Sequence, residues 1–151
     1  MADRMSPEDR SRLMARVKRS NTKPEMVVRR LLHARGYRFR LHVKTLPGTP
    51  DVVLARRKVA IFVNGCFWHG HSCRLGRLPS SRPEYWIPKI EGNRERDARK
   101  VQLLLDTGWR VLTVWQCTLK EQGIALEQIE TFLQSETKVA ETRIHARSPG
   151  N

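Results

Sequence analysis

The chain has 151 residues, with 29 Lys and Arg against 15 Asp and Glu, so its formal net charge is +14 and its pI is near 10.8. Hydrophobic residues make up 39% of it, which is enough for one core of ordinary single-domain size. No apolar run approaches the roughly 20 residues of a membrane-spanning helix, and residues 1–10 lack the apolar stretch of a signal peptide. These features exclude a membrane protein, a collagen and a secreted mini-scaffold, and predict a cytoplasmic protein that binds polyanions.

The positive charge is concentrated toward the N-terminus. Residues 1–44 carry 13 basic and 4 acidic side chains, residues 45–117 carry 12 and 6, and residues 118–151 carry 4 and 5. The polyanion surface therefore excludes the C-terminal part. The first 20 residues are rich in Arg and Ser, with one weak helical stripe that includes Met14 and Val17. We expect this arm to become ordered only on its partner.

Hydrophobic patterning predicts the element order α-β-β-β-α-β-α. The first helix begins with a capping box formed by Thr22 and Glu25, and it ends at Gly36. Apolar runs and turn residues predict the rest: strands over 37–43, 51–54 and 59–63, a helix over 93–107, a strand over 109–115 and a helix over 124–134. The strands over 51–54 and 59–63 are expected to form a hairpin. This order indicates an α/β fold in which helices flank a mixed sheet. The folded domain is expected over 21–135, followed by a polar flexible tail over 136–151.

Three cysteines and two histidines are placed to form a metal site. Cys66, His69, His71 and Cys73 lie within eight residues, and Cys117 follows the last predicted strand, from which a sheet could bring it back. Thiolate and imidazole are ligands suited to zinc, and a closed set of three Cys and one His is usually structural. We interpret Cys66, His71, Cys73 and Cys117 as this set, which leaves His69 as the spare. The alternative is buried thiols beside a solvated histidine.

Three carboxylates occupy positions that suit either chemistry or structure. Asp51 follows a proline where a strand begins, so it either holds a hard cation such as Mg²⁺ or serves the turn. Asp97 lies four residues before Val101, on the inward stripe of its helix, where it is a functional group or the buried partner of Arg94 or another base. Glu25 is fully explained by the capping box. Residue type and spacing leave these alternatives open.

Large aromatic residues stand among Gly, Pro and Arg in the segment between the predicted elements. Phe67, Trp68 and Trp86 are expected outside regular structure, where rings can stack on bases or enter a duplex. Aromatic residues more often belong to a core, and we assign Trp109 and Trp115 to the sheet for that reason.

Three segments together carry a family resemblance. They are VNGCFWHGHSC at 63–73, PGTPD at 47–51 and WRVLTVW at 109–115. The chain resembles the very short patch repair (Vsr-type) DNA mismatch endonucleases from its basic arm to Cys117. The resemblance implies a restriction-endonuclease-like core of αβββαβ order, which matches the order predicted from patterning. It also implies an enzyme that nicks the thymine strand of a T:G mispair left by deamination of 5-methylcytosine.

The resemblance implies a role for each candidate residue. Asp51 becomes the direct Mg²⁺ ligand together with the main-chain carbonyl of Val63, and His69 becomes the general base. Asp97 and Asn64 hold metal-bound water, and Glu25 joins the active-site set. The structural zinc ligands match Cys66, His71, Cys73 and Cys117, and the DNA-contacting residues match Phe67, Trp68, Trp86, Met14 and Val17. We expect a monomer that acts on double-stranded DNA with a T:G mismatch, with a DNA cytosine methyltransferase and mismatch-repair proteins as candidate partners.

The chain departs from its family pattern at Asn64, where the best-known relatives have a histidine. An amide cannot accept a proton at neutral pH, which leaves His69 as the only evident base. The Glu-x-Lys signature of restriction-type nucleases is also absent, because residues 61–63 are Ile, Phe and Val. We expect His69 to fill the role of that lysine.

Three other interpretations remain open at this point. A zinc-stabilised, non-catalytic DNA-binding protein needs only the charge, the Cys and His set and the aromatic residues. A basic RNA-binding protein has no use for the Asp51 and His69 pairing. A nuclease without mismatch specificity has the same chemistry but no need for an aromatic wedge.

Overall fold

The computed structural model describes residues 21–144, so the basic arm with Met14 and Val17 lies outside the described residues. The helices are α2 (Lys23–Ala34), α3 (Pro83–Asp106) and α4 (Gln122–Gln134). The strands are β1 (Arg40–Leu41), β2 (Val52–Leu54), β3 (Val59–Asn64), β4 (Arg110–Trp115) and β5 (Val139–Glu141), and short 3₁₀ turns are formed by Ala55–Arg57, Arg74–Gly76 and Gln116–Lys120. The elements from α2 to β4 follow the predicted αβββαβ order.

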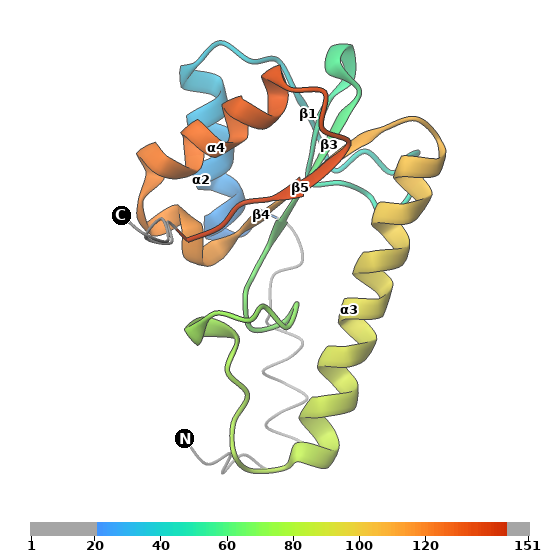
Figure 1. Cartoon of the computed structure of the whole chain (residues 1–151), viewed down its shortest axis with the longest axis vertical. Helices are drawn as coiled ribbons and strands as arrows, with labels where there is room; N and C mark the ends of the chain where they lie inside the picture. Colours follow the sequence, from blue (N-terminus) through green and yellow to red (C-terminus); the bar gives the residue numbers. More distant parts are fainter. Residues whose placement is uncertain (1–20, 145–151) are drawn as a thin grey trace, which may run out of the picture.

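The five strands form one mixed sheet in the order β1-β2-β3-β4-β5. The pairs β1–β2 and β2–β3 are antiparallel, which confirms the predicted hairpin, whereas β3–β4 and β4–β5 are parallel. Antiparallel neighbours need only a tight turn, but the parallel step from β3 to β4 requires a long crossover that contains α3. Figure 1 shows α2 and α4 on one face of the sheet and α3 on the other.

Alternation along β3 supplies the two faces of the core. Val59, Ile61 and Val63 pack with residues of α2 and α4, whereas Ala60 and Phe62 pack with Leu104 and its neighbours on α3. All six residues of β3 are buried, as expected for a central strand covered on both faces. The central strands are therefore a rigid support for residues at their ends.

Two strand predictions are corrected by the structure. The strand predicted over 37–43 contains only Arg40 and Leu41 in a ladder, and both are exposed. It ends because His42 adopts a left-handed backbone conformation with φ of 45°, which turns the chain. Residues 139–141, assigned to the polar tail, instead form β5, and Thr142 after it is buried. Residues 145–151 of that tail lie outside the described residues.

The second helix begins ten residues earlier than predicted, at Pro83, and continues through Pro88. Trp86 is consequently a helical residue that is 7% exposed and packs against Phe67 and Trp68, rather than a loop residue. Proline at the first helical position is favourable, which places the helix start before the aromatic residue. The lower part of α3 in Figure 1 extends beyond the sheet and runs beside the 65–82 segment.

Candidate active site and metal centres

Glu25 and Asp51 form a carboxylate pair where α2 meets the start of β2. Glu25 is buried in the first turn of α2, and its Oε2 accepts a 2.7 Å hydrogen bond from the Thr22 N–H, so the predicted capping box is present. Asp51 Oδ2 accepts a 2.8 Å hydrogen bond from the Val63 N–H, which ties its side chain to β3. The cap therefore uses only one carboxylate oxygen of Glu25, and the other is free to take part in the site.

The environment drives the pKa values of these two carboxyl groups apart. Burial, followed by the hydrogen bond with Glu25, raises the pKa of Asp51 to about 8. Burial also raises the pKa of Glu25, but its hydrogen bonds with Asp51, the Thr22 backbone and His42 outweigh this, so that its pKa lies below the ordinary value. Two carboxylates this close cannot both ionise without a counter-charge. In the absence of a cation the pair shares one proton, and a divalent cation can replace it.

His42 belongs to this site, although its position falls within the strand predicted over 37–43. Its Nε2 lies 3.2 Å from Glu25 Oε1 and 4.0 Å from Asp51 Oδ1. Glu25, His42 and Asp51 form a group whose ligand atoms lie within 4.8 Å of one another and could hold a metal ion. No pattern in the sequence indicated this role, because the position depends on the turn at the end of β1.

His69 and Asp97 form a second pair, between the loop after β3 and helix α3. His69 Nδ1 lies 2.5 Å from Asp97 Oδ2, and the two side chains are 29% and 24% exposed. The partner of Asp97 is therefore a histidine and not Arg94. Lys100, one turn further along α3, places Nζ 4.0 Å from Asp97 Oδ1.

Lys100 also connects this pair with the carboxylate site. Its positive charge acts to lower the pKa of Asp51, against the effect of burial. Its aliphatic stem passes over Gly48, where a Cβ atom would lie 2.6 Å from Lys100 Cγ. Because Gly48 also has a positive φ of 75°, this turn position favours glycine on both counts. No motif in the sequence pointed to Lys100, which is a cation beside Asp51 in a core that lacks Glu-x-Lys.

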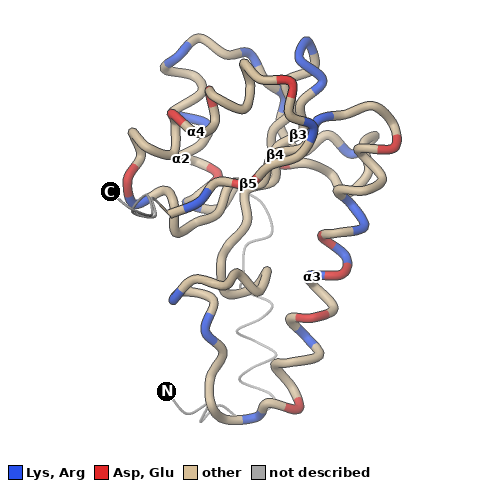
Figure 2. Tube along the Cα trace, viewed as in Figure 1, with Lys and Arg blue, Asp and Glu red and all other residues tan. Residues whose placement is uncertain are grey.

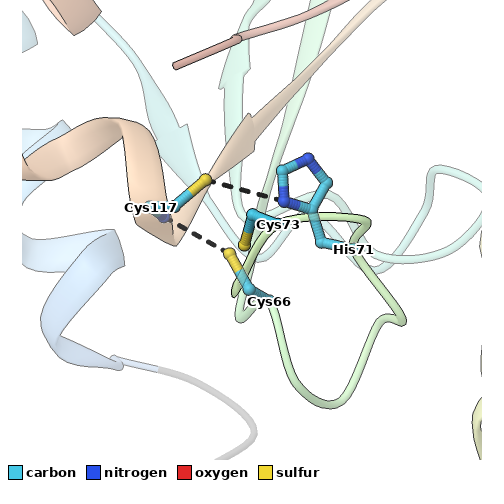
Figure 3. A group of neighbouring side chains, drawn as sticks. All are labelled: Cys66, His71, Cys73 and Cys117. Carbon is cyan, nitrogen blue, oxygen red and sulfur yellow. Dashed lines mark hydrogen bonds between the residues drawn. The ribbon is translucent and has the colours of Figure 1, made fainter. Parts of the chain in front are cut away.

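The second metal centre joins the ends of β3 and β4. These strands are parallel and pair Asn64 with Trp115, so Cys66 and Cys117 each lie two residues beyond a paired position. The side chains of Cys66, His71, Cys73 and Cys117 converge, as Figure 3 shows, with ligand atoms within 4.8 Å of one another. The parallel sheet thus brings the remote cysteine back as predicted, and the cluster is able to bind a metal.

The packing around this cluster fixes its ligands in place. The His71 ring stacks on Trp115 with a centroid distance of 4.1 Å, and the Cys117 N–H donates to Cys66 Sγ over 3.3 Å. A Cβ atom at Gly76 would lie 1.9 Å from the His71 carbonyl oxygen, so the loop closes only over glycine. Burial and the neighbouring Cys66 raise the pKa of Cys117 to about 12. A thiol of this kind becomes a thiolate when a metal binds, which fits a soft-ligand site.

The aromatic residues form one cluster between the 65–82 segment and α3. The centroid distances are 5.0 Å for Phe67–Trp68 and 5.2 Å for Phe67–Trp86, in edge-to-face arrangements. Phe67 and Trp68 are partly exposed, whereas Trp86 is buried among Phe67, Trp68 and Tyr85. Phe67 and Trp68 therefore present more ring surface to a ligand than Trp86. Figure 2 shows basic residues along this segment and on the adjoining helix α3.

Fold comparison finds a solved structure with the same architecture. The structure matches the catalytic domain of the homing endonuclease I-Bth0305I with a TM-score of 0.52 and 23% sequence identity, covering 76% of this chain and all of that domain. At this identity the match concerns the fold, which is the restriction-endonuclease-like core predicted above. Within residues 21–144, no helix is both long and apolar enough to cross a membrane.

Sequence comparison then identifies the family. The family model described as DNA mismatch endonuclease Vsr matches residues 2–75. The type II nicking enzyme V.XorIIP of Xanthomonas oryzae pv. oryzae is 61% identical over 133 residues, which cover 88% of this chain and 98% of that protein. The DNA mismatch endonuclease Vsr of Escherichia coli is 42% identical over 120 residues, covering 80% and 77% respectively. The chain belongs to the Vsr family of DNA endonucleases.

Proposed function

We propose that this endonuclease nicks the thymine strand of double-stranded DNA at T:G mispairs, in a reaction that depends on Mg²⁺. The observation that carries the proposal is the pair formed by the buried Glu25 and the partly buried Asp51 in a chain of the Vsr family. Buried carboxylates with a shared proton are costly unless they serve a cation or a reaction. Such T:G mispairs arise when 5-methylcytosine is deaminated, which supports a role in DNA repair and a cytoplasmic location with the chromosome.

The carboxylate pair supplies the ligands for the catalytic cation. Asp51 would hold Mg²⁺ directly, the main-chain carbonyl of Val63 would be a second ligand, and Asn64 would hold a bound water. When bound, the cation polarises the scissile phosphate and stabilises the leaving oxygen. The 2.8 Å hydrogen bond from the Val63 N–H keeps Asp51 aimed at the end of β3, beside that carbonyl. The oxygen ligands offered here suit a hard cation.

His69 is the group that would take the proton of the attacking water. Asp97 accepts a hydrogen bond from Nδ1 over 2.5 Å, which leaves the lone pair on His69 Nε2 available as a base. The family resemblance also gives Asp97 the role of holding metal-bound water, and orienting His69 is compatible with that role because each carboxylate has two oxygens. Glu25 stays anchored through its hydrogen bond in the helix cap, and its other carboxylate oxygen would contribute to the cation site.

The remaining residues would provide substrate recognition and stability. Phe67 and Trp68, supported by Trp86, would enter the duplex beside the mispair, where the base step is already weakened. The aromatic residues would approach from the major groove, and Met14 and Val17 of the arm would contact the DNA in the minor groove. A zinc ion held by Cys66, His71, Cys73 and Cys117 would connect the loop that carries Phe67 and Trp68 to the sheet.

The test is a nicking assay with Mg²⁺ on one labelled duplex with a T:G mispair in a deaminated methylation site, beside its fully paired twin. We expect nicking of the thymine strand of the mispaired duplex alone, and no nicking by Asp51→Asn, which keeps the size of the side chain. Equal cutting of both duplexes would reject mismatch specificity. Binding of the mispaired duplex without cutting by the parent protein would reject the proposed catalysis.

A further inference from the structure

The position of His42 is set by contacts with both carboxylate-bearing elements. Its backbone N–H donates to the Asp51 carbonyl oxygen over 3.2 Å, and its ring reaches Glu25 on α2. The left-handed backbone, with φ of 45°, is uncommon for residues other than glycine and is maintained only where the surroundings demand it. The structure therefore directs this imidazole into the site instead of leaving it on the strand surface.

The spacing of the three side chains is that of ligands to one cation. His42 Nε2 is 3.2 Å from Glu25 Oε1 and 4.0 Å from Asp51 Oδ1. Six-coordinate cations with bonds of about 2.1 Å have adjacent ligand atoms about 3 Å apart and opposite ones about 4 Å apart. Both observed separations fall in this range without rearrangement of the backbone.

Arg29 is a second polar neighbour of the His42 imidazole. Its Nη2 lies 3.5 Å from His42 Nε2 and 2.7 Å from Asn21 Oδ1. A guanidinium group can only donate hydrogen bonds, whereas the Glu25 carboxylate, 3.2 Å from the same nitrogen, can only accept them. A cation that binds His42 Nε2 beside Glu25 therefore takes the place of the proton between them.

We propose that His42 is a direct ligand of the divalent cation that Glu25 and Asp51 hold, and that this site consequently binds Mn²⁺ more tightly than Mg²⁺. Imidazole nitrogen suits transition-metal ions, whereas Mg²⁺ prefers oxygen ligands and retains its waters. The inference deepens the proposed function, because it names the metal preference of the same site. It concerns binding by the protein alone and can be tested without DNA.

The experiment is pulsed electron paramagnetic resonance of Mn²⁺ bound to the full zinc-loaded chain. We expect a nitrogen-14 coupling typical of coordinated imidazole in the parent protein and its loss in His42→Gln. His33→Gln is the matched control, because His33 is an exposed histidine of α2, and His69→Asn tests the histidine assigned as the general base. Both controls should retain the coupling. Titration should show Mn²⁺ affinity reduced about tenfold or more in His42→Gln, with a smaller change in Mg²⁺ affinity measured by competition.

A spectrum without nitrogen coupling in the parent protein would overturn the proposal, as would a coupling that survives in His42→Gln. An equal loss of affinity for both metals would show that His42 only positions the carboxylates. These readouts are independent of mismatch nicking. A protein that binds Mn²⁺ through His42 but cuts no T:G duplex would reject the proposed function alone.

Discussion

His69 Nδ1 lies 2.5 Å from Asp97 Oδ2, so a histidine of the loop after β3 is oriented by a carboxylate of helix α3. This arrangement fixes which ring nitrogen carries the proton and which remains a base. The two residues are 28 positions apart in the chain, and the pairing depends on the crossover that packs α3 across the sheet.

The pairing predicts graded losses of activity. Asp97→Asn should lower the single-turnover nicking rate about 10²-fold, and His69→Asn should lower it about 10²–10⁴-fold, because positioned acid and base groups contribute in this range. The effect of Asp97→Asn should be much smaller when His69 is already replaced, since Asp97 orients that histidine, and any loss that remains measures its second role on metal-bound water. Rates measured on a T:G duplex check this order. Strictly additive losses would show that Asp97 does not act through His69.

The raised pKa of Asp51 predicts a pH-dependent requirement for Mg²⁺. Below about pH 8 the metal-free site holds a proton that the cation must displace, so the Mg²⁺ concentration for half-maximal nicking should fall about tenfold per pH unit between pH 6 and pH 8. Above pH 8 it should become constant. Glu25→Gln removes the neighbouring carboxylate charge and should shift this dependence to lower pH. A Mg²⁺ requirement that is unchanged between pH 6 and pH 8 would contradict the shared proton.

The same raised pKa affects stability in a definite direction. The folded metal-free protein binds the Asp51 proton more tightly than the unfolded chain does. The stabilisation that this proton gives to the folded state is therefore present at low pH. It is lost as the pH rises from the ordinary pKa of an aspartate toward about 8. Thermal unfolding of the metal-free protein should show this loss, and added Mg²⁺ should diminish it.

Replacing Phe67 or Trp68 should impair nicking of mispaired DNA more than it impairs binding to paired DNA. Phe67→Ala and Trp68→Ala should each reduce nicking of the T:G duplex about 5- to 150-fold, which corresponds to the loss of about 1–3 kcal/mol of stacking. Leu103→Ala removes another exposed apolar side chain, from α3, and should have no effect. Binding to a fully paired duplex, followed by fluorescence anisotropy, should be unchanged in all three variants. An equal loss of affinity for both duplexes would instead indicate general DNA binding.

The close approach at Gly76 predicts a loss of stability on adding one methyl group. Gly76→Ala should destabilise the protein by at least about 1–3 kcal/mol, because the new Cβ overlaps the His71 carbonyl oxygen. Gly123→Ala is the control, since nothing lies within 4 Å of its added Cβ and alanine favours helix α4. Melting temperatures measured side by side should fall for the first variant and remain equal or rise for the second. The reverse result would mean that the loop adjusts freely.

Metal analysis should separate the two centres. Cys117→Ser should lower both bound zinc and the yield of folded protein, because a closed four-ligand site loses a ligand. His69→Asn changes the histidine next to the cluster and should keep its zinc while losing activity. Elemental analysis of the purified variants decides between these outcomes. Full zinc occupancy in Cys117→Ser would exclude that residue as a ligand.

Local patterns in the sequence were sufficient for most of the fold. The capping box at Thr22 and Glu25, the hairpin and the apolar run of β3 depend on neighbouring residues, so they are readable without a structure. The cysteine cluster was predictable because the ligand types are distinctive and Cys117 follows a strand. The strand over 139–141 was missed, since it has the composition of a polar tail and is stabilised by pairing with β4.

The composition of the active site was only partly contained in the sequence. Asp51 and Glu25 could be named as residues, but their shared proton depends on the packing of α2 against the end of β2. His42 enters the site through one left-handed residue, and the pairing of His69 with Asp97 requires two elements distant in the chain to meet. Periodicity and capping report local backbone preference, whereas the distances and burial that shift a pKa or form a metal site arise only when the sheet and its helices pack together.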